Sequence, residues 1–519
     1  MKQAEVARSA IWNALGYLLS AVISLAYPIL LLKWLGRSAY GIVSYLALLT
    51  NQSYLLNLGL GEAMAQYLTV KASQNALEEG KKAIQAALAG VWSISLLLTL
   101  AWLFFGVEGL ASLLKLGEAE KNLLAQVKLW VPPAVWGIQT GMLLNWIPIA
   151  LGRFQWAAFN TILQAVWQAL FPILLLWGKD KADPITALKA ILTGYLLYGL
   201  TLWLFVWRVI GKPPLPGKMP LLFSLWKKGI WQGAQVLVGL PYTFAERTFI
   251  ARWISLELMG LYSVVHYFVS KIIALAQKLV EVLFPVFGSV TDSPTRQSLR
   301  LSQTTWLISL VSSISSLWGT ALLIGGLRVF SLRLELTERM LLVAAIGGLV
   351  TYLPTLPTVT FFQSRGGFRL LFWLSFIIVG IQLASTPIFL AYRLVFFSFI
   401  LGGVLWMGLF AVSLAQRKVS FALWRRWVMP TYLRLLLLWA VGGGAWIFLP
   451  KQLQNGEVIA AILLLGLGLL AIGMDLQGKK NTAKRIFLRQ LSQSLRELSE
   501  RRWRRFLRPK RETALNNRK

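Results

Sequence analysis

The stretch AIWNALGYLLSAVISLAYPILLL, from Ala10 to Leu32, decides the fold of this chain. About 20 helical residues, rising 1.5 Å each, are enough to cross a hydrocarbon core of about 30 Å. A cleavable signal peptide would have a shorter apolar region that ends at a small-residue cleavage site. This run instead continues into Lys33 and Trp34. We therefore interpret it as a retained membrane span.

Similar apolar runs recur along the whole chain of 519 residues. The chain is 57% hydrophobic and only 14% charged, with a mean hydropathy of +0.63, whereas soluble domains are about 25% charged. We therefore expect an all-α polytopic membrane protein with about fourteen transmembrane helices. The predicted spans are Ala10–Leu32, Tyr40–Leu60, Ala83–Phe105, Val127–Ile149, Trp156–Trp177, Ile185–Val206, Gly229–Ile254, Leu258–Phe284, Thr304–Gly326, Met340–Phe362, Leu370–Ala391, Leu394–Ala415, Tyr432–Leu449 and Val458–Ile472.

Basic residues predict which side of the membrane each loop faces. Lys and Arg concentrate in cytoplasmic loops, and a cytoplasmic N-terminus places the two largest basic clusters on that side. Both termini are then expected to be cytoplasmic. The formal net charge of +32 reflects this asymmetry and attraction to anionic lipid. A nucleic-acid partner is not expected, because it would need a soluble basic domain. The clusters are Lys212, Lys218, Lys227 and Lys228, and Arg417, Lys418, Arg425 and Arg426.

The sequence contains an internal repeat. A shift of 219 positions places the first two predicted spans on the seventh and eighth. Because six spans separate the copies, both enter the membrane in the same direction. This predicts two six-helix lobes related by a parallel pseudo-two-fold axis along the membrane normal, plus two extra helices. The matching positions are Ile11-Trp12-Asn13 with Ile230-Trp231-Gln232, Lys33-Trp34-Leu35 with Arg252-Trp253-Ile254, Gly41 with Gly260, Ser44 with Ser263, and Glu62 with Glu281.

The repeat divides the chain into four predicted segments. They are an N-terminal lobe over 1–219, a C-terminal lobe over 220–430, two further spans over 431–477 and a basic tail over 478–519. In the tail, apolar residues recur at near-helical spacing until Pro509. This pattern predicts an amphipathic helix that lies on the anionic inner leaflet. Docking of a partner protein is the alternative interpretation.

Four stretches carry a resemblance to a known family. They are LLKWLGRSAYG at 31–41, LNLGLGEAMAQYL at 56–68, ARWISLELMGLYSVVHYF at 251–268 and VLFPVFGSV at 282–290. Over its first twelve spans the chain resembles the bacterial polysaccharide biosynthesis, or O-antigen, flippases. Their superfamily also contains multidrug/oligosaccharidyl-lipid exporters and peptidoglycan lipid II flippases. The second copy departs from the Leu-Gly-x-x-x-Tyr-Gly element of the first, with Ser255 for Gly36 and Met259 for Tyr40.

The resemblance implies a multi-pass protein of the bacterial cytoplasmic (inner) membrane. Its cargo would be a lipid-linked oligosaccharide, such as a lipopolysaccharide O-antigen unit on undecaprenyl diphosphate. A duplicated helical bundle is suited to alternating access. We expect a monomer, with a glycan polymerase or glycosyltransferases as possible further partners. An ion-coupled multidrug antiporter of the same superfamily is the alternative. A membrane polymerase or ligase would need catalytic residues on an outer domain, so we expect no enzyme.

Charged residues inside the predicted spans are the candidate cargo site, because a charge at the bilayer centre is costly unless it faces water or a partner. Arg247, Lys271 and Lys278 would bind a diphosphate through charge-assisted hydrogen bonds. Ion pairs that only stabilise packing are the alternative, favoured for Lys278 with Glu281. Amide side chains expected to line the same cavity are Asn13, Gln52 and Gln232, of which Asn13 pairs with Gln232 in the repeat and Gln52 with Lys271.

Ion coupling would need a buried carboxylate that changes its protonation state. The candidates are Glu246, Glu281 and Glu62. For Glu281 and Glu62, anchoring of loops at the ends of spans is the alternative interpretation. His266 is the one histidine in the sequence, and we interpret it as packed or interfacial rather than as a proton relay. No GxxxxGK[ST] loop for ATP is present. We therefore expect secondary transport, with no cofactor and no metal site.

Overall fold

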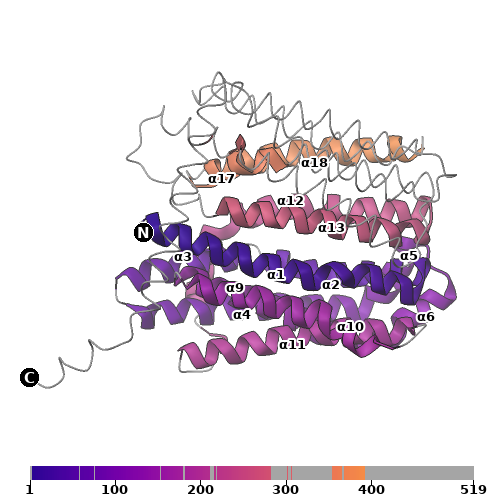
Figure 1. Ribbon diagram of the computed structural model, residues 1–519, viewed down its shortest axis with the longest axis horizontal. Helices are drawn as coiled ribbons and strands as arrows, with labels where there is room; N and C mark the ends of the chain where they lie inside the picture. The colour runs from indigo at the N-terminus through magenta and orange to yellow at the C-terminus, as the bar shows by residue number, and fades with distance from the viewer. Residues whose placement is uncertain are drawn as a thin grey trace, which may run out of the picture.

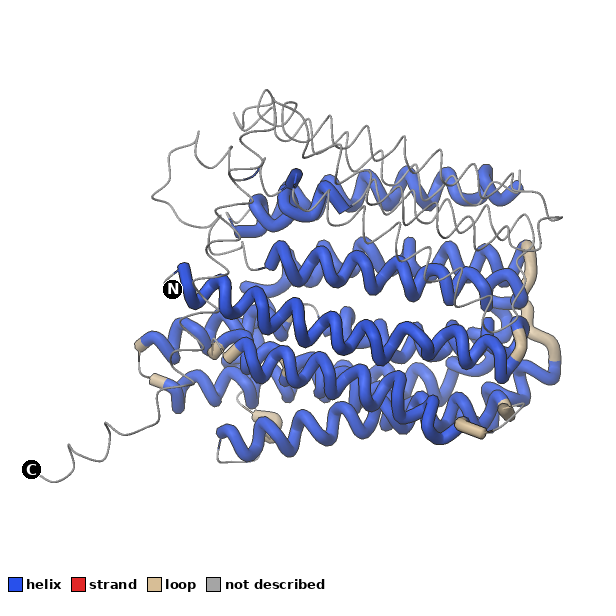
Figure 2. The backbone as a smooth tube through the Cα atoms, in the orientation of Figure 1, coloured by secondary structure: helices blue, strands red, loops and turns tan. Residues whose placement is uncertain are grey.

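The computed structural model describes residues 3–281, 301, 305–306, 353–364 and 368–391, apart from positions 58, 75, 152, 179–181, 211–214 and 218. Every regular element in this part of the chain is helical (Figure 2). Helices suit a hydrocarbon environment because they satisfy their backbone hydrogen bonds internally. The predicted spans Thr304–Gly326, Leu394–Ala415, Tyr432–Leu449 and Val458–Ile472, most of Met340–Phe362, and the basic tail lie outside the described residues.

The helices run side by side along the long axis of the molecule (Figure 1). Those before residue 211 are α1 Gln3–Leu35, α2 Arg37–Gln52, α3 Leu60–Ser73, α4 Leu77–Ala101, α5 Val107–Leu114, α6 Glu118–Val127, α7 Val131–Leu144, α8 Trp146–Ala150, α9 Phe154–Ala165, α10 Phe171–Leu176 and α11 Pro184–Ile210. The later ones are α12 Met219–Trp253, α13 Leu256–Glu281, α17 Leu356–Ser364 and α18 Phe368–Ala391. Short tighter or wider turns join some of them: η1 Ser53–Asn57, η2 Trp102–Gly106, η3 Lys128–Trp130, η4 Val166–Leu170 and η5 Leu353–Thr355.

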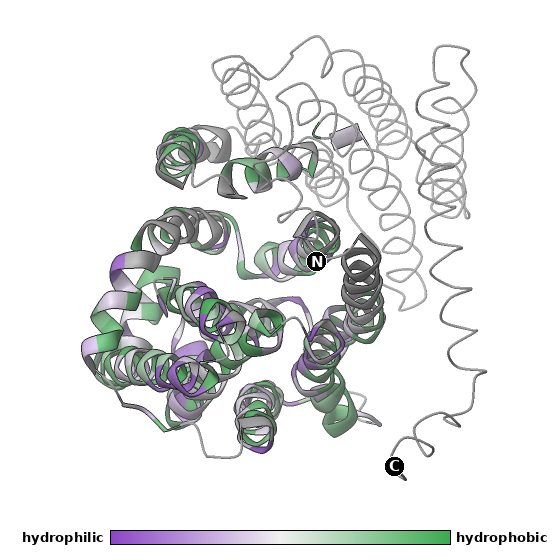
Figure 3. Cartoon of the chain, turned by 90° about the vertical axis from the view of Figure 1, so that its left-hand side faces the viewer, coloured by the Kyte–Doolittle hydropathy of each residue, from purple (hydrophilic) through white to green (hydrophobic). Residues whose placement is uncertain are grey.

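Within the described residues, five helices are long and apolar enough to cross a membrane: Gly16–Leu35, Leu77–Leu114, Gln155–Leu176, Pro184–Arg208 and Leu256–Gln277. Large apolar side chains are exposed on the bundle surface, and Phe104 and Phe105 are each 73% exposed. Viewed end-on, hydrophobic residues are found on all the described helices (Figure 3). Such exposure is expected where lipid, rather than water, surrounds the protein. The chain is a multi-pass membrane protein, and the total of fourteen spans stays a prediction.

Two predicted spans have different limits in the structure. The span predicted at Tyr40–Leu60 is interrupted, because Gly59 has φ +74° and α3 begins after it. Positive φ is readily accessible only to glycine, so the chain changes direction there and continues as helix to Ser73. The span predicted at Ala83–Phe105 extends through the π-turn η2 into α5. Val107–Leu114, expected to be part of a connecting loop, is therefore helical.

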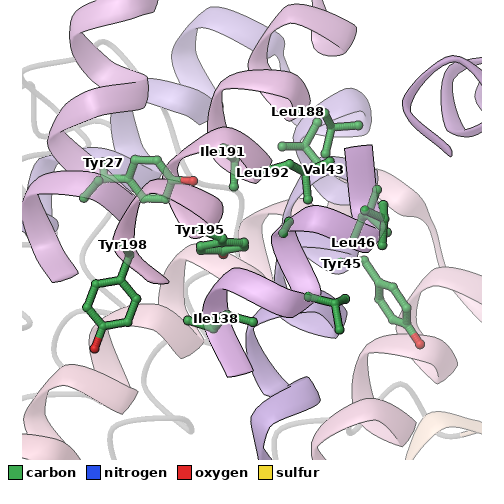
Figure 4. Close-up of a cluster of buried hydrophobic side chains, with 14 of the residues drawn as sticks. Tyr27, Val43, Tyr45, Leu46, Ile138, Leu188, Ile191, Leu192, Tyr195 and Tyr198 are labelled. Atoms are coloured by element: carbon green, nitrogen blue, oxygen red, sulfur yellow. The ribbon is translucent and has the colours of Figure 1, made fainter. Parts of the chain in front are cut away.

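The core of the N-terminal half is formed mainly by α2, α7 and α11. Figure 4 shows Ile138 of α7 near Tyr195 of α11, with Ile191 and Leu188 farther along α11. Helices α7 and α11 approach so closely that a Cβ atom at Gly137 would lie 2.5 Å from the carbonyl oxygen of Tyr195. Small residues commonly allow such backbone contact in membranes, where lipid removes the hydrophobic drive for helix association.

The predicted repeat is visible in two helical hairpins, α1 with α2 and α12 with α13. In the first, the break between helices falls at Gly36, whose φ is +76°. A shift of 219 positions places this break at Ser255, and α13 begins at the next residue. Ser255 Oγ accepts a hydrogen bond of 3.0 Å from the backbone N–H of Leu258. The second copy thus replaces a permissive glycine with a helix-capping serine, and the hairpin is retained.

The two hairpins also contact each other reciprocally. A Cβ atom at Gly41 would lie 2.5 Å from the carbonyl oxygen of Leu256, and one at Gly260 would collide with the carbonyl oxygen of Arg37. Gly41 and Gly260 are equivalent in the repeat, and so are Arg37 and Leu256. The crossing of α2 and α13 therefore has the two-fold symmetry that the sequence predicts. The lobe boundaries at 219 and 430 stay predictions.

Candidate functional site

The predicted cargo residues lie where the two hairpins meet. Helix α13 packs against α1 and α2, while α12 packs against α3, α4, α5, η1 and α18. The second hairpin thus covers a face of the N-terminal half that is made of its first helices, α1 to α5. Arg247 on α12 and Lys271 on α13 both belong to this interface region.

Arg247 is buried, with only 4% of its surface exposed. Its guanidinium is close enough to Tyr40 and Tyr45 of α2 and to His266 of α13 to interact with them electrostatically. The neighbouring Thr248 shares a hydrogen bond of 2.7 Å between its Oγ1 and the Oη of Tyr45. Arg247 therefore lies among polar groups of three helices rather than against lipid. A role in cargo binding stays a prediction.

Lys271 lies in the middle of α13 and is partly buried. Its Nζ atom is 5.0 Å from the centre of the Tyr267 ring, a cation–π contact. Its carbonyl oxygen accepts a hydrogen bond of 2.8 Å from Tyr17 Oη of α1. Tyr267, one helical turn before Lys271, thus stabilises the ammonium without neutralising its charge. The sequence analysis did not identify this contact.

Gln52 and Glu62 lie on either side of the break in the second span. Gln52 is the last residue of α2 and is partly buried. Glu62 lies in the first turn of α3, where a carboxylate interacts favourably with the helix dipole. Whether Glu62 anchors the chain at the end of the span or takes part in ion coupling stays a prediction.

The other predicted site residues can be placed only on their helices. Asn13 lies on α1, Gln232 and Glu246 lie on α12, and Lys278 and Glu281 lie on α13. Their side chains lie outside the described part of the structure, so their roles stay predictions. His266 is partly buried and packs against Tyr262, with ring centres 5.9 Å apart. This contact agrees with a packed histidine.

Sequence reasoning missed a group of tyrosines around the same interface. Tyr27, Tyr40, Tyr195 and Tyr267 come from α1, α2, α11 and α13 and lie close enough to interact electrostatically. The Tyr27 and Tyr267 ring centres are 6.2 Å apart. Tyr195 Oη donates a hydrogen bond of 3.2 Å to the carbonyl oxygen of Ala47, and Figure 4 shows Tyr195 with Tyr27. Tyrosines within or at the start of apolar spans were the signal that could have found this group.

Buried amide groups add to the polar interior of the N-terminal half. Gln139 is fully buried on α7, and Asn57 is 7% exposed in η1. The Oε1 atom of Gln139 and the Oδ1 atom of Asn57 accept no hydrogen bond within the described part of the chain. In the same part of the chain, no three His, Asp or Glu side chains are grouped as metal ligands. The interface thus offers cations, hydroxyls and aromatic faces.

Comparisons with known proteins agree on the architecture. The sequence profile of the family described as "Polysaccharide biosynthesis protein" matches residues 6–291. No curated protein matches the chain. The fold resembles the lipid II flippase MurJ in an inward closed conformation, at 14% identity and a TM-score of 0.68, covering 90% of this chain and 99% of that one.

Two further solved structures share the fold. An inward-facing multidrug resistance MATE transporter of the MOP superfamily matches at 15% identity with a TM-score of 0.54, covering 80% of this chain and 98% of its own. A MOP superfamily transporter from Pyrococcus furiosus, described as having a binding pocket of reverse polarity, matches at 15% identity with a TM-score of 0.54. It covers 81% of this chain and 96% of its own. At such low identity, these likenesses establish the fold alone.

Proposed function

Because the chain belongs to the polysaccharide biosynthesis protein family, we propose that it is a flippase that carries a lipid-linked oligosaccharide across the bacterial cytoplasmic membrane. The observation that carries this proposal is a buried guanidinium, that of Arg247, at the interface of two repeat-related hairpins. A buried cation inside a membrane-spanning bundle is costly, so such residues normally face polar groups or a water-filled path and mark a substrate pathway. An anionic cargo that enters between the hairpins gives such a cation a function.

The chemistry of the interface suits a diphosphate bearing a sugar chain. Arg247 can form a two-point contact with phosphate oxygens, and Lys271 can act as a point charge. Tyrosine hydroxyls and the Gln52 amide can bond sugar hydroxyls, and aromatic faces can stack on sugar rings. The finer assignment, an O-antigen unit of lipopolysaccharide on undecaprenyl diphosphate, belongs to this proposal, as do cavity roles for Asn13, Gln232 and Lys278.

The proposed orientation follows from the basic loops. With both termini cytoplasmic, the basic cluster at Lys227 and Lys228 faces the cytoplasm, and the Gly36 turn faces the opposite side. Transport would be secondary, with Glu246, Glu281 or Glu62 as the ion-coupling carboxylate. The basic tail would bind anionic lipid, with glycosyltransferases or a polymerase as further partners of a monomeric flippase.

A multidrug antiporter is the second candidate, because a multidrug MATE transporter shares the fold. Its cationic cargo would be repelled by the charges of Arg247 and Lys271. The two functions are therefore separable by the charge of the cargo.

The test is translocation in vesicles containing the full chain and a fluorescent undecaprenyl diphosphate oligosaccharide. Arg247→Ala and Lys271→Ala should each lower the translocation rate by about 10- to 100-fold, because a hydrogen bond to a charged group contributes about 1.5–3 kcal/mol. Arg153→Ala and Lys227→Ala remove exposed cations and should leave the rate unchanged. Uptake of a cationic dye, with no lipid translocation, would favour the antiporter instead. Because Arg247→Lys keeps the positive charge, a translocation rate that falls in Arg247→Ala but not in Arg247→Lys would reflect lost charge rather than lost packing.

A further inference from the structure

At two places, glycines bring the backbones of the N-terminal half and the second hairpin into direct contact. At the first place, which we call the Gly41 crossing, Gly41 of α2 and Gly260 of α13 each lie against a carbonyl oxygen of the other helix. At the second, which we call the Gly59 contact, a Cβ atom at Gly59 would collide with the carbonyl oxygen of Gly229 on α12. It would also lie 3.2 Å from the backbone nitrogen of Gly233.

The two contacts lie toward opposite ends of the interface. Gly41 lies one turn from the break that begins α2, whereas Gly59 follows the turn η1 that ends it. The intervening 18 positions span roughly 27 Å at 1.5 Å per residue, close to the thickness of a hydrocarbon core. Gln52 and Lys271 each lie 11 positions from their own glycine of the Gly41 crossing, between the two contacts. Gln52 and Lys271, two of the proposed cargo residues, therefore lie between the two glycine contacts.

We propose that the Gly41 crossing and the Gly59 contact are the two gates of the transport path, each closed by backbone contact that only glycine permits. This inference rests on the alternating access of the proposed function and is independent of its cargo. Both contacts are made in this structure, so the interface is closed at both ends. Transport then requires each contact to separate in turn while the other is kept.

Backbone contact through glycine suits a gate that must open repeatedly. Because glycine has no side chain, the two helices meet along small, flat backbone surfaces. The helices can therefore separate without withdrawing a large side chain from a pocket. The Gly41 crossing is also supported by hydrogen bonds between the halves. Tyr45 shares one with Thr248, and Arg252 Nη1 donates one of 3.3 Å to the carbonyl oxygen of Leu113 at the end of α5.

The test uses single-cysteine reporters, since the natural chain has no cysteine. Ser263→Cys reports on the Gly41 crossing, because Ser263 lies one turn from Gly260 and is 4% exposed. Ser53→Cys reports on the Gly59 contact, because Ser53 lies in η1 and is 8% exposed. The measurement is the rate of labelling by a membrane-impermeant maleimide, added from each side of vesicles that contain the full chain and no cargo lipid.

Glycine substitutions should open the gates separately. Gly260→Ala should raise labelling at position 263 about tenfold, which corresponds to a shift of about 1.4 kcal/mol between closed and open states. Labelling at position 53 should not rise. Gly59→Ala should instead raise labelling at position 53, and labelling at position 263 should not rise. Gly41→Ala, on the other side of the same crossing, should reproduce the Gly260→Ala result.

Matched controls separate gate opening from general damage. Gly109→Ala places a Cβ in open space within α5, and Gly36→Ala carries the same positive-φ strain as Gly59→Ala without a neighbour within 4 Å. Neither should change labelling at either reporter. Equal labelling in test and control variants, or a rise at both reporters together, would overturn the proposal. If each glycine substitution raises labelling only at its own reporter but the protein does not translocate lipid-linked sugar, the proposed gates stand and the proposed cargo is wrong.

Discussion

The two ends of the hairpin interface are built differently. At the Gly41 crossing the contact is symmetric, because each of two equivalent glycines meets the backbone of the other helix. At the Gly59 contact the symmetry is lost. The repeat-equivalent of Gly59 is Lys278 and that of Gly229 is Ala10, so the equivalent pair of positions has no glycine to form the same contact. One end preserves the duplication and the other end has diverged from it.

This difference indicates which properties the duplication retained. A symmetric crossing keeps the two hairpins aligned about their common axis. The asymmetric contact also joins the two copies, but its equivalent pair, Lys278 and Ala10, contains no glycine. Substitutions at two equivalent positions should therefore have similar effects at the Gly41 crossing, whereas the Gly59 contact has no equivalent glycine.

The largest expected effect comes from replacing both glycines of the symmetric crossing with valine. A branched side chain cannot fit against a carbonyl oxygen, and overpacking costs about 1–3 kcal/mol at each position. Gly41→Val with Gly260→Val should lower the midpoint of thermal unfolding in detergent more than either change alone. The same double substitution in open space, at Gly109 and Gly380, is the control. Equal losses in both pairs would show that the crossing is no closer than its surroundings.

The next effect is at the asymmetric end. Gly59→Ala combines left-handed strain, about 1–2 kcal/mol, with a collision against Gly229, whereas Gly36→Ala carries the strain alone. The stability of both variants can be compared by titration with a denaturing detergent. Gly59→Ala should be the less stable of the two. If the two variants are equally stable, the Gly59 contact contributes nothing beyond backbone conformation.

A smaller effect concerns the loop beside the Gly36 turn. Asp183 accepts hydrogen bonds from the backbone N–H groups of Ile185 and Thr186 at the start of α11. Partial burial raises the pKa of Asp183, but the hydrogen bonds lower it by more, so the pKa lies below its ordinary value. Asp183→Ala should cost about 1 kcal/mol at neutral pH.

The pH dependence of that loss follows from the lowered pKa. Stability from Asp183 is present above the unfolded pKa of about 3.9 and is lost as pH falls through the lower folded value. The difference in unfolding midpoint between Asp183→Ala and the natural chain should therefore shrink below about pH 4. Asp183→Asn keeps an acceptor without the charge and should show little pH dependence. A difference that persists at low pH would contradict the assigned role of the carboxylate.

The smallest effect is expected at the hydrogen bond that supports the Gly41 crossing. Thr248→Val removes the 2.7 Å bond to Tyr45 while preserving side-chain shape. Polar bonds between membrane helices contribute about 0.6 kcal/mol on average. The variant should raise labelling at position 263 about two- to threefold, less than Gly260→Ala does. An effect as large as that of the glycine substitution would assign the gate to Tyr45 and Thr248 instead.

Several features of the fold were predictable because they depend on local sequence. The apolar run from Pro184 to Ile210 forms a single helix, and the break at Gly36 recurs at Ser255 as the repeat requires. The interruption at Gly59 was missed, because hydropathy is continuous across it. The extension through η2 was missed because the prediction ended with the apolar run at Phe105, although Leu110, Leu113 and Leu114 continue the apolar pattern.

The candidate site was less predictable than the fold. The sequence singled out Arg247 and Lys271 as charges inside spans, and both lie in the interface region. It could not show that Tyr267 would stabilise Lys271, or that tyrosines from four helices would gather nearby. Such contacts depend on which helices meet and at what rotation, and hydropathy does not encode either.

The sequence by itself determined that this protein is a helical membrane protein, built on a duplicated hairpin. Hydrophobic length is a property of neighbouring residues, and the repeated Trp, Gly and Glu positions are a match between two stretches of sequence, so both can be recognised without a structure. Only the tertiary structure decided that Gly41 meets Gly260 and that Gly59 meets Gly229. Both contacts join residues about 170 or more positions apart in the sequence, and only the packing of whole helices brings them together.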